Sequence, residues 1–144
     1  MFKRIVIIAV CFVLLTGFAG NYSADAVELK SQEHVITPDW ENVLSVSLDM
    51  SFSNGTITST GTVRGQSGTT AITATFVLAR RNANGTFTEV DRWIAVNGNI
   101  PSILTSSRTT QNQPAGTYRL SITTSVTRNG KTETVPGNHT ATFR

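Results

Sequence analysis

Apolar and polar residues alternate along most of the chain from residue 43 to its end, which is the pattern of β-strands that bury one face. The segment 43–52 shows it most clearly, since every second residue from Leu44 to Phe52 is apolar and the residues between them are Ser or Asp. No stretch after residue 43 has the 3.6-residue period of a helix. The pattern predicts seven strands, at about 43–52, 56–63, 72–78, 86–96, 102–110, 118–128 and 132–143.

Three Asn-Gly pairs, at 54–55, 84–85 and 129–130, separate neighbouring strands. Asn-Gly suits the positive φ angles of a tight hairpin turn, so the strands on either side of each pair are expected to lie antiparallel and adjacent. The other connections are free to cross between layers. Two sheets follow, one with strands 43–52, 56–63 and 102–110, the other with strands 86–96, 72–78, 118–128 and 132–143 in that order.

The turn at Asn129-Gly130 also fixes a register. Counting outward from it places Thr127 opposite Thr132 and Thr124 opposite Val135, which keeps the apolar residues of both strands on one face. A Tyr that opens a strand after a Gly turn, as in 116–118, is typical of the tyrosine corner of immunoglobulin-like sandwiches. We therefore predict an all-β fold, a seven-stranded antiparallel sandwich of immunoglobulin-like, fibronectin type III-like topology over residues 43–144. Its predicted core holds Leu48, Phe52, Phe76, Leu78, Tyr118, Leu120 and Ile122.

The strand 86–96 fits the sandwich in two orientations. The even-numbered residues form a mainly aliphatic row, Val90, Arg92, Ile94 and Val96. The odd-numbered residues carry the aromatic rings and two carboxylates, Phe87, Glu89, Asp91 and Trp93. We expect the aliphatic row to face the core, because this avoids burying the two carboxylates. The alternative is that Trp93 turns inward at a bulge or lies under the segment before residue 43.

With the aliphatic row inward, the aromatic row becomes a candidate binding surface on the outside of a sheet. Its residues are Arg80, Arg81, Phe87, Arg92 and Trp93. An exposed Trp on a flat sheet suits stacking on a sugar ring or gripping a protein partner.

Residues 1–26 have the features of a secretory signal peptide: Lys3 and Arg4, an apolar run over 5–19, and an Ala-x-Ala site at 24–26. The run is short for a permanent membrane helix, so no membrane anchor is expected after cleavage. The only cysteine, Cys11, lies inside it, and an exported domain without disulfides favours a bacterial source. Residues 27–42 are polar and without periodicity, and they predict a lead-in segment that Trp40 docks onto the domain.

The hairpin and corner motifs at 79–93 and 116–120 resemble those of the many small secreted proteins of Gram-positive bacteria that consist of a signal peptide and one immunoglobulin-like sandwich. The resemblance covers the whole exported domain. It implies a fold, and it implies no active site.

No motif for nucleotide, zinc or serine-hydrolase chemistry occurs in the sequence. His34 lies in the lead-in and His139 follows an expected bulge in the last strand, so a solvated or structural role is favoured for both histidines. Glu89 and Asp91 are candidates for a calcium site or an acid/base pair, but a solvated face beside Arg92 explains them better. We therefore expect no enzyme activity, no cofactor and no metal site.

The formal net charge is +3, and Arg80-Arg81 is the only basic pair outside the leader. Nucleic acid is therefore not an expected partner, whereas a cationic face attracts anionic cell-wall polymer at modest strength. The expected function is a secreted, non-catalytic binding or cell-surface interaction module, whose partner is a cell-wall polymer, a glycan or a protein. The alternatives are a small secreted inhibitor acting through the loop 111–115 and a structural envelope component that assembles through edge strands.

Overall fold

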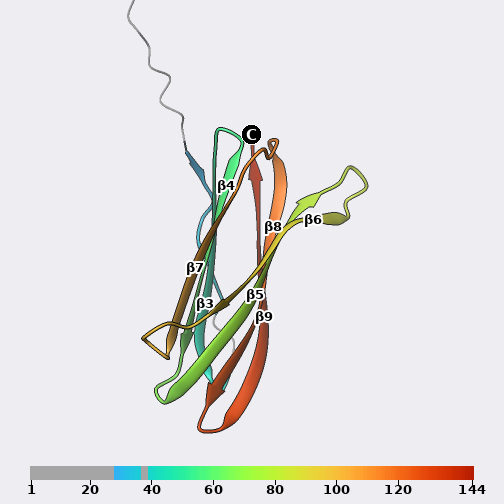
Figure 1. Ribbon diagram of the computed structural model, residues 1–144. Helices are drawn as coiled ribbons and strands as arrows, with labels where there is room; N and C mark the ends of the chain where they lie inside the picture. The colour runs from blue at the N-terminus through green and yellow to red at the C-terminus, as the bar shows by residue number, and fades with distance from the viewer. Residues whose placement is uncertain (1–27, 37–38) are drawn as a thin grey trace, which may run out of the picture.

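The computed structural model describes residues 28–36 and 39–144, and these form two antiparallel sheets of five and four strands that stay open rather than closing into a barrel (Figure 1). The predicted leader, 1–26, lies outside the described residues. The first sheet comprises β1 (Leu29–Lys30), β2 (His34–Ile36), β3 (Val43–Ser53), β4 (Thr56–Gly65) and β7 (Ile103–Thr110). The second comprises β6 (Phe87–Val96), β5 (Thr69–Arg81), β8 (Gly116–Arg128) and β9 (Lys131–Phe143).

The strand order confirms the pairing predicted from the turns. β3, β4 and β7 are neighbours in one sheet, and the other runs β6-β5-β8-β9. Asn129 and Gly130 have φ angles of 50° and 75°, as a type I′ turn requires. Thr127 pairs with Thr132 and Thr124 with Val135, so the predicted register of this hairpin is correct.

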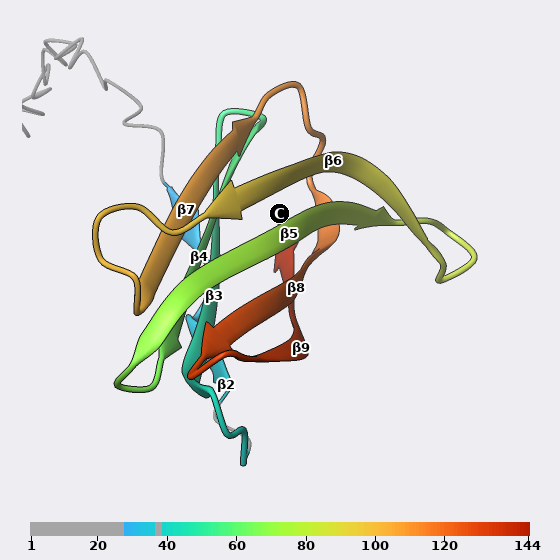
Figure 2. The same ribbon diagram turned by 60° about the horizontal axis from the view of Figure 1, so that its bottom comes forward.

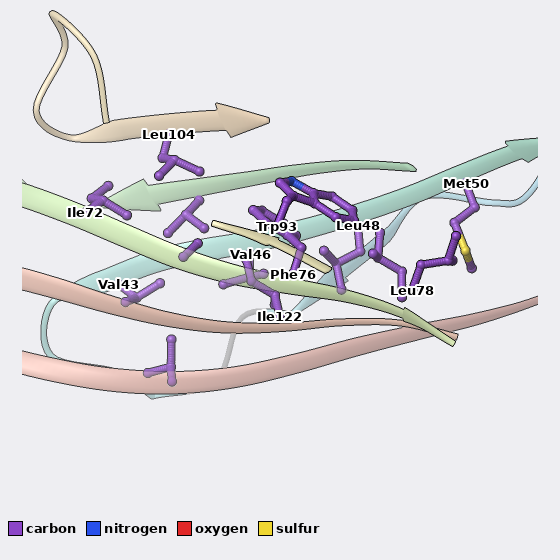
Figure 3. Packing of buried hydrophobic residues seen from close by; sticks show 14 of the residues in the cluster. Val43, Val46, Leu48, Met50, Ile72, Phe76, Leu78, Trp93, Leu104 and Ile122 are labelled. Carbon is purple, nitrogen blue, oxygen red and sulfur yellow. The ribbon is translucent and has the colours of Figure 1, made fainter. Parts of the chain in front are cut away.

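The apolar rows of both sheets meet in one core, part of which Figure 3 shows. Six of the seven predicted core residues are buried, and the seventh, Phe52, is half-buried and stacks on Phe143 with ring centroids 5.5 Å apart. Tyr118 makes the hydrogen bond expected of a tyrosine corner, since its hydroxyl donates to the Pro114 carbonyl at 2.6 Å. This bond ties the β7–β8 connection to the start of β8.

The start of β3 departs from the simple alternation. A register shift between Val43 and Ser45 turns Val43 into the core and leaves Leu44 54% exposed. Leu44 therefore does not belong to the buried row in which the alternation placed it, because an irregularity at the end of a strand inverts the parity before it.

The orientation expected for β6, with the aliphatic row inward, is wrong, and the alternative in which Trp93 turns inward at a bulge is confirmed. Trp93 is buried, 8% exposed, while Ile94 and Val96 are 69% and 68% exposed. The cause is a bulge: Leu78 pairs with Asp91 and Ala79 with Glu89, which leaves Val90 as an extra residue and inverts the parity of β6 beyond it.

Two groups of contacts stabilise the inverted orientation. The Trp93 indole stacks on Phe76 with centroids 4.9 Å apart, and its Nε1 donates to Ser106 Oγ of β7 at 3.0 Å. Asp91, turned towards β7, accepts from Arg108 Nε at 3.1 Å and Thr110 Oγ1 at 3.0 Å. The expected penalty for burying this carboxylate is thus offset by two donors that the sequence did not reveal.

The polar lead-in is more ordered than the sequence suggested, because its described part supplies β1 and β2, which both pair with β3. Trp40 packs against the core, as predicted. Ile36 lies against Gly137 of β9, where an added Cβ would stand 2.9 Å from Ile36 Cδ1. The segment therefore covers the open side of the sandwich between β3 and β9. No helix in the described ranges is long and apolar enough to cross a membrane.

Candidate contact surface on the four-stranded sheet

The outer face of the four-stranded sheet carries a cluster of charged and aromatic side chains near the β5–β6 hairpin (Figure 2 shows this end of the sheet). The register places Phe87 beside Arg81 and places both Glu89 and Arg119 beside Ala79. Leu78, Tyr118 and Leu120 point into the core, so their odd-numbered neighbours in β5 and β8 point outward. We call this set the cationic face: Arg81, Phe87, Glu89, Arg92 and Arg119.

Phe87 and Arg119 form the centre of the cationic face. The Arg119 guanidinium carbon lies 4.0 Å from the centroid of the Phe87 ring, within the range of a cation–π contact. Arg119 Nε is buried there and has no hydrogen-bond partner among the described residues. The guanidinium therefore contacts the Phe87 ring while keeping its positive charge.

Glu89 and Arg92 neutralise each other beside this pair. Arg92 donates to the two Glu89 carboxylate oxygens at 3.0 and 2.6 Å, a bidentate contact. The hydrogen bond lowers the pKa of Glu89 and raises that of Arg92. Neither Arg81 nor Arg119 forms an ion pair with a carboxylate of the described residues, so these two side chains carry the net positive charge of the face.

The structure retains three of the five residues proposed from the sequence and adds two, Glu89 and Arg119. Arg81, Phe87 and Arg92 share the outer face. Trp93 belongs to the core, and Arg80 lies on the other parity, opposite Tyr118, with its guanidinium against Gly116. Arg119 was missed, although its position next to the inward Tyr118 already predicts an outward side chain.

Hydroxyl groups cover the rest of the same outer face. Cross-strand pairs of Ser and Thr side chains hydrogen-bond along β8 and β9 at 2.9–3.0 Å: Thr117 with Thr142, Ser125 with Thr134, and Thr127 with Thr132. Threonine suits exposed strands, and these pairs make the face polar without charging it. The charged cluster therefore stands out on a neutral surface.

A second cluster lies where the lead-in meets β9. His34 and His139 stack with ring centroids 5.7 Å apart, and His139 Nε2 lies 2.9 Å from Ser31 Oγ. Ser31 Oγ also accepts from Met50 N at 3.1 Å and lies within donating distance of Met50 O and Asp49 Oδ1, at 2.9 and 3.3 Å. Burial lowers the pKa of His139, His34 lowers it further, and Asp49 opposes the shift.

This cluster joins a histidine, a hydroxyl and a carboxylate, but in an order that differs from a catalytic triad. A triad carboxylate orients the histidine, whereas Asp49 contacts the hydroxyl of Ser31 instead. Ser31 is also engaged with the backbone of Met50 on both its donor and acceptor sides. An open hollow of about 530 Å³, lined by residues 29–32 and 139–144, adjoins the cluster. The contacts of Ser31 fit a structural role, in which Ser31 attaches the lead-in to the sheet, better than the role of an activated nucleophile.

The described residues contain no group of three or more His, Cys, Asp or Glu side chains placed to hold a metal ion. No protein-family model matches the chain, and neither the curated proteins nor the solved structures yield a match. The class that the fold defines is thus an all-β protein of two open antiparallel sheets, consistent with a β-sandwich.

Proposed function

We propose that this chain is an exported, non-catalytic binding module that contacts anionic polymer of a bacterial cell surface through the cationic face. The observation that carries the proposal is the pair Arg81 and Arg119, which flank Phe87 without an ion-pair partner among the described carboxylates. Guanidinium groups recognise phosphate and carboxylate oxygens in bidentate fashion. The predicted leader, 1–26, supports export.

We further propose that the sandwich has immunoglobulin-like, fibronectin type III-like topology. The strand order β6-β5-β8-β9 beside β3-β4-β7 supports it, as does the hydrogen bond of Tyr118 to Pro114. The fold serves recognition in many proteins, but the binding role rests on the surface and not on the topology.

The binding experiment uses the chain expressed with its own leader and purified as exported. Sedimentation with purified Gram-positive cell wall measures binding before and after extraction of the wall's anionic phosphodiester polymers. The variant Arg81→Gln/Arg119→Gln is expected to lose about tenfold in affinity or more, since it removes both unpaired charges. Binding of the wild type should weaken as salt rises.

Arg64→Gln/Lys131→Gln is the matched control, because it removes the same charge from exposed positions away from the cationic face. Equal loss in both double variants would show that net charge, rather than this face, drives binding. Binding that survives polymer extraction would favour a neutral glycan or a protein partner. Competition by double-stranded DNA at the same strength would contradict the expected exclusion of nucleic acid.

The cluster at His139 gives the second candidate function, hydrolysis. Its motivation is the contact of His139 Nε2 with Ser31 Oγ at 2.9 Å. Peptide, glycan and ester substrates are the appropriate panel. We expect no hydrolysis that depends on Ser31, so the wild type and Ser31→Ala should give the same result. Turnover that disappears in Ser31→Ala but persists in Arg81→Gln/Arg119→Gln would replace the binding proposal with an enzyme.

A secreted inhibitor and a structural envelope component would each use a different part of the molecule. An inhibitor would act through the loop 111–115, and Asn112 in that loop has a positive φ of 58°. A structural envelope component would assemble through its edge strands. Substitution of Gln111 and Gln113 tests the inhibitor function without touching the cationic face.

A further inference from the structure

The free edges of the two sheets are not equally protected against pairing. β1 and β2 cover the outer edge of β3, β9 contains Pro136, and Arg108 places a charge on β7. These devices are the usual ones that prevent association of edges. The second half of β6, 93–96, has none of them, since it contains neither a charge nor a proline.

The backbone of this half of β6 offers unused hydrogen-bonding groups. Asn97 N donates to Ile72 O at 2.9 Å, so Asn97 points its amide towards β5. The direction of the backbone amide alternates along an antiparallel strand. The amides of Ala95 and Trp93 therefore also point towards β5, whereas the amides of Ile94 and Val96 point away from β5, to the free edge. The same two residues expose large apolar side chains on the outer face.

We propose that the edge of β6 at Ile94 and Val96 pairs with the same edge of a second copy of this chain. The two strands run antiparallel about a twofold axis perpendicular to the sheet, with Ile94 opposite Val96 of the partner subunit. The twofold axis produces two such pairs of Ile94 with Val96, and each pair exchanges two backbone hydrogen bonds. The four-stranded sheets of both copies thereby join into one.

The charge pattern favours a second copy as the occupant. Residues 93–107 contain no charged side chain, so the edge offers nothing to a charged peptide. In the proposed register Arg92 lies opposite Gly98 of the partner subunit, which avoids the repulsion of two facing arginines. The apolar side chains bury each other on the shared outer face, where Thr73 and Thr75 are their neighbours in β5.

Hydrogen exchange and sedimentation velocity of the exported chain test the proposal together. We expect a monomer–dimer equilibrium whose dimer fraction rises with concentration, as mass action requires. Protection of the Ile94 and Val96 amides should rise in parallel. The Trp93 and Ala95 amides serve as an internal control, because they bond to β5 in monomer and dimer alike and should stay protected at every concentration.

Ile94→Lys is expected to raise the dimer dissociation constant by about tenfold or more, since it places a lysine on the edge strand. Leu44→Lys is the matched control, because Leu44 is similarly exposed but lies on the other sheet, and it should leave the constant unchanged. Three results would overturn the proposal: a monomer at all concentrations, a dimer that Ile94→Lys leaves intact, or Ile94 and Val96 amides that exchange freely in the dimer. Pairing of this edge with an added extended peptide, without a dimer, would overturn it as well.

Discussion

Gly61 illustrates at the scale of one residue what the sequence does and does not reveal. Its place among apolar positions of a strand predicts either a bulge or a close approach. The register across β4 is unbroken at this position, with Gly61 opposite Leu48 on one side and Ser106 on the other, so no bulge is present. A Cβ there would stand 2.2 Å from Phe76 Cε1, which identifies a close approach.

Gly61→Ala is therefore expected to destabilise the fold by about 1–3 kcal/mol, because it forces the Phe76 ring out of a packed core. Urea unfolding measures this as a lower midpoint with an unchanged slope. Gly98→Ala is the control, since an added Cβ meets nothing within 4 Å there and the residue has no positive φ. An equal effect of both substitutions would show that backbone entropy or strain, and not core packing, causes the loss in the free energy of unfolding.

At the scale of the element, strand pairing could be predicted where turn chemistry determines it. Asn129-Gly130 fixed the β8–β9 register correctly because a two-residue turn leaves no freedom to slip. β6 could not be oriented in the same way. Its parity depends on the bulge at Val90, and the bulge is tolerated because Arg108 and Thr110, on another strand, satisfy Asp91. Only the tertiary structure brings those donors together.

The candidate surface shows the same division. Arg81, Phe87 and Arg92 share a face that parity and spacing could indicate. Arg119 joins them only through the pairing of β8 with β5, across a long stretch of chain. An unbroken alternation along β6 places Trp93 on the surface, whereas the extra residue Val90 reverses the positions after it and turns Trp93 inward.

The lead-in segment makes stability depend on pH. His139 has its pKa lowered from 6.5 by burial and by the stacked His34, against the opposing effect of Asp49. The unfolded chain therefore binds this proton more readily than the folded protein, so the free energy of unfolding falls as the pH drops from about 7.5 to 5. Chemical denaturation at several pH values measures the decline.

His139→Gln should flatten the dependence in this window, since it removes the titrating group. Glu89 and Asp91, whose pKa values are lowered from 4.5 and 3.8, change stability with pH in the same direction, but the stability they supply is lost only at lower pH, where these carboxylates are protonated. A decline between pH 7.5 and 5 that persists unchanged in His139→Gln would assign it to another group.

For the whole molecule, the decisive feature is that both sheets are assembled from strands distant in sequence. Thr124 Oγ1 of β8 donates to Thr73 O of β5 at 3.1 Å across 51 residues of chain, and β4 pairs with β7 beyond an intervening hairpin. Only the hairpin turns are local. The entropy of closing these loops must be lost before the long-range pairs stabilise anything, so folding is slow, on the order of milliseconds to seconds.

Stopped-flow refolding followed by tryptophan fluorescence should show this rate, because Trp93, bonded to Ser106 of β7, and Trp40 reach their places against the core only when the two sheets pack together. A microsecond phase that carries the full fluorescence change would contradict it. Slow folding suits the proposed export, because a chain that stays extended and free of stable tertiary structure can be threaded through a membrane pore. With no cysteine after Cys11, such a chain would then reach its final form without any oxidation step, on the far side of the membrane.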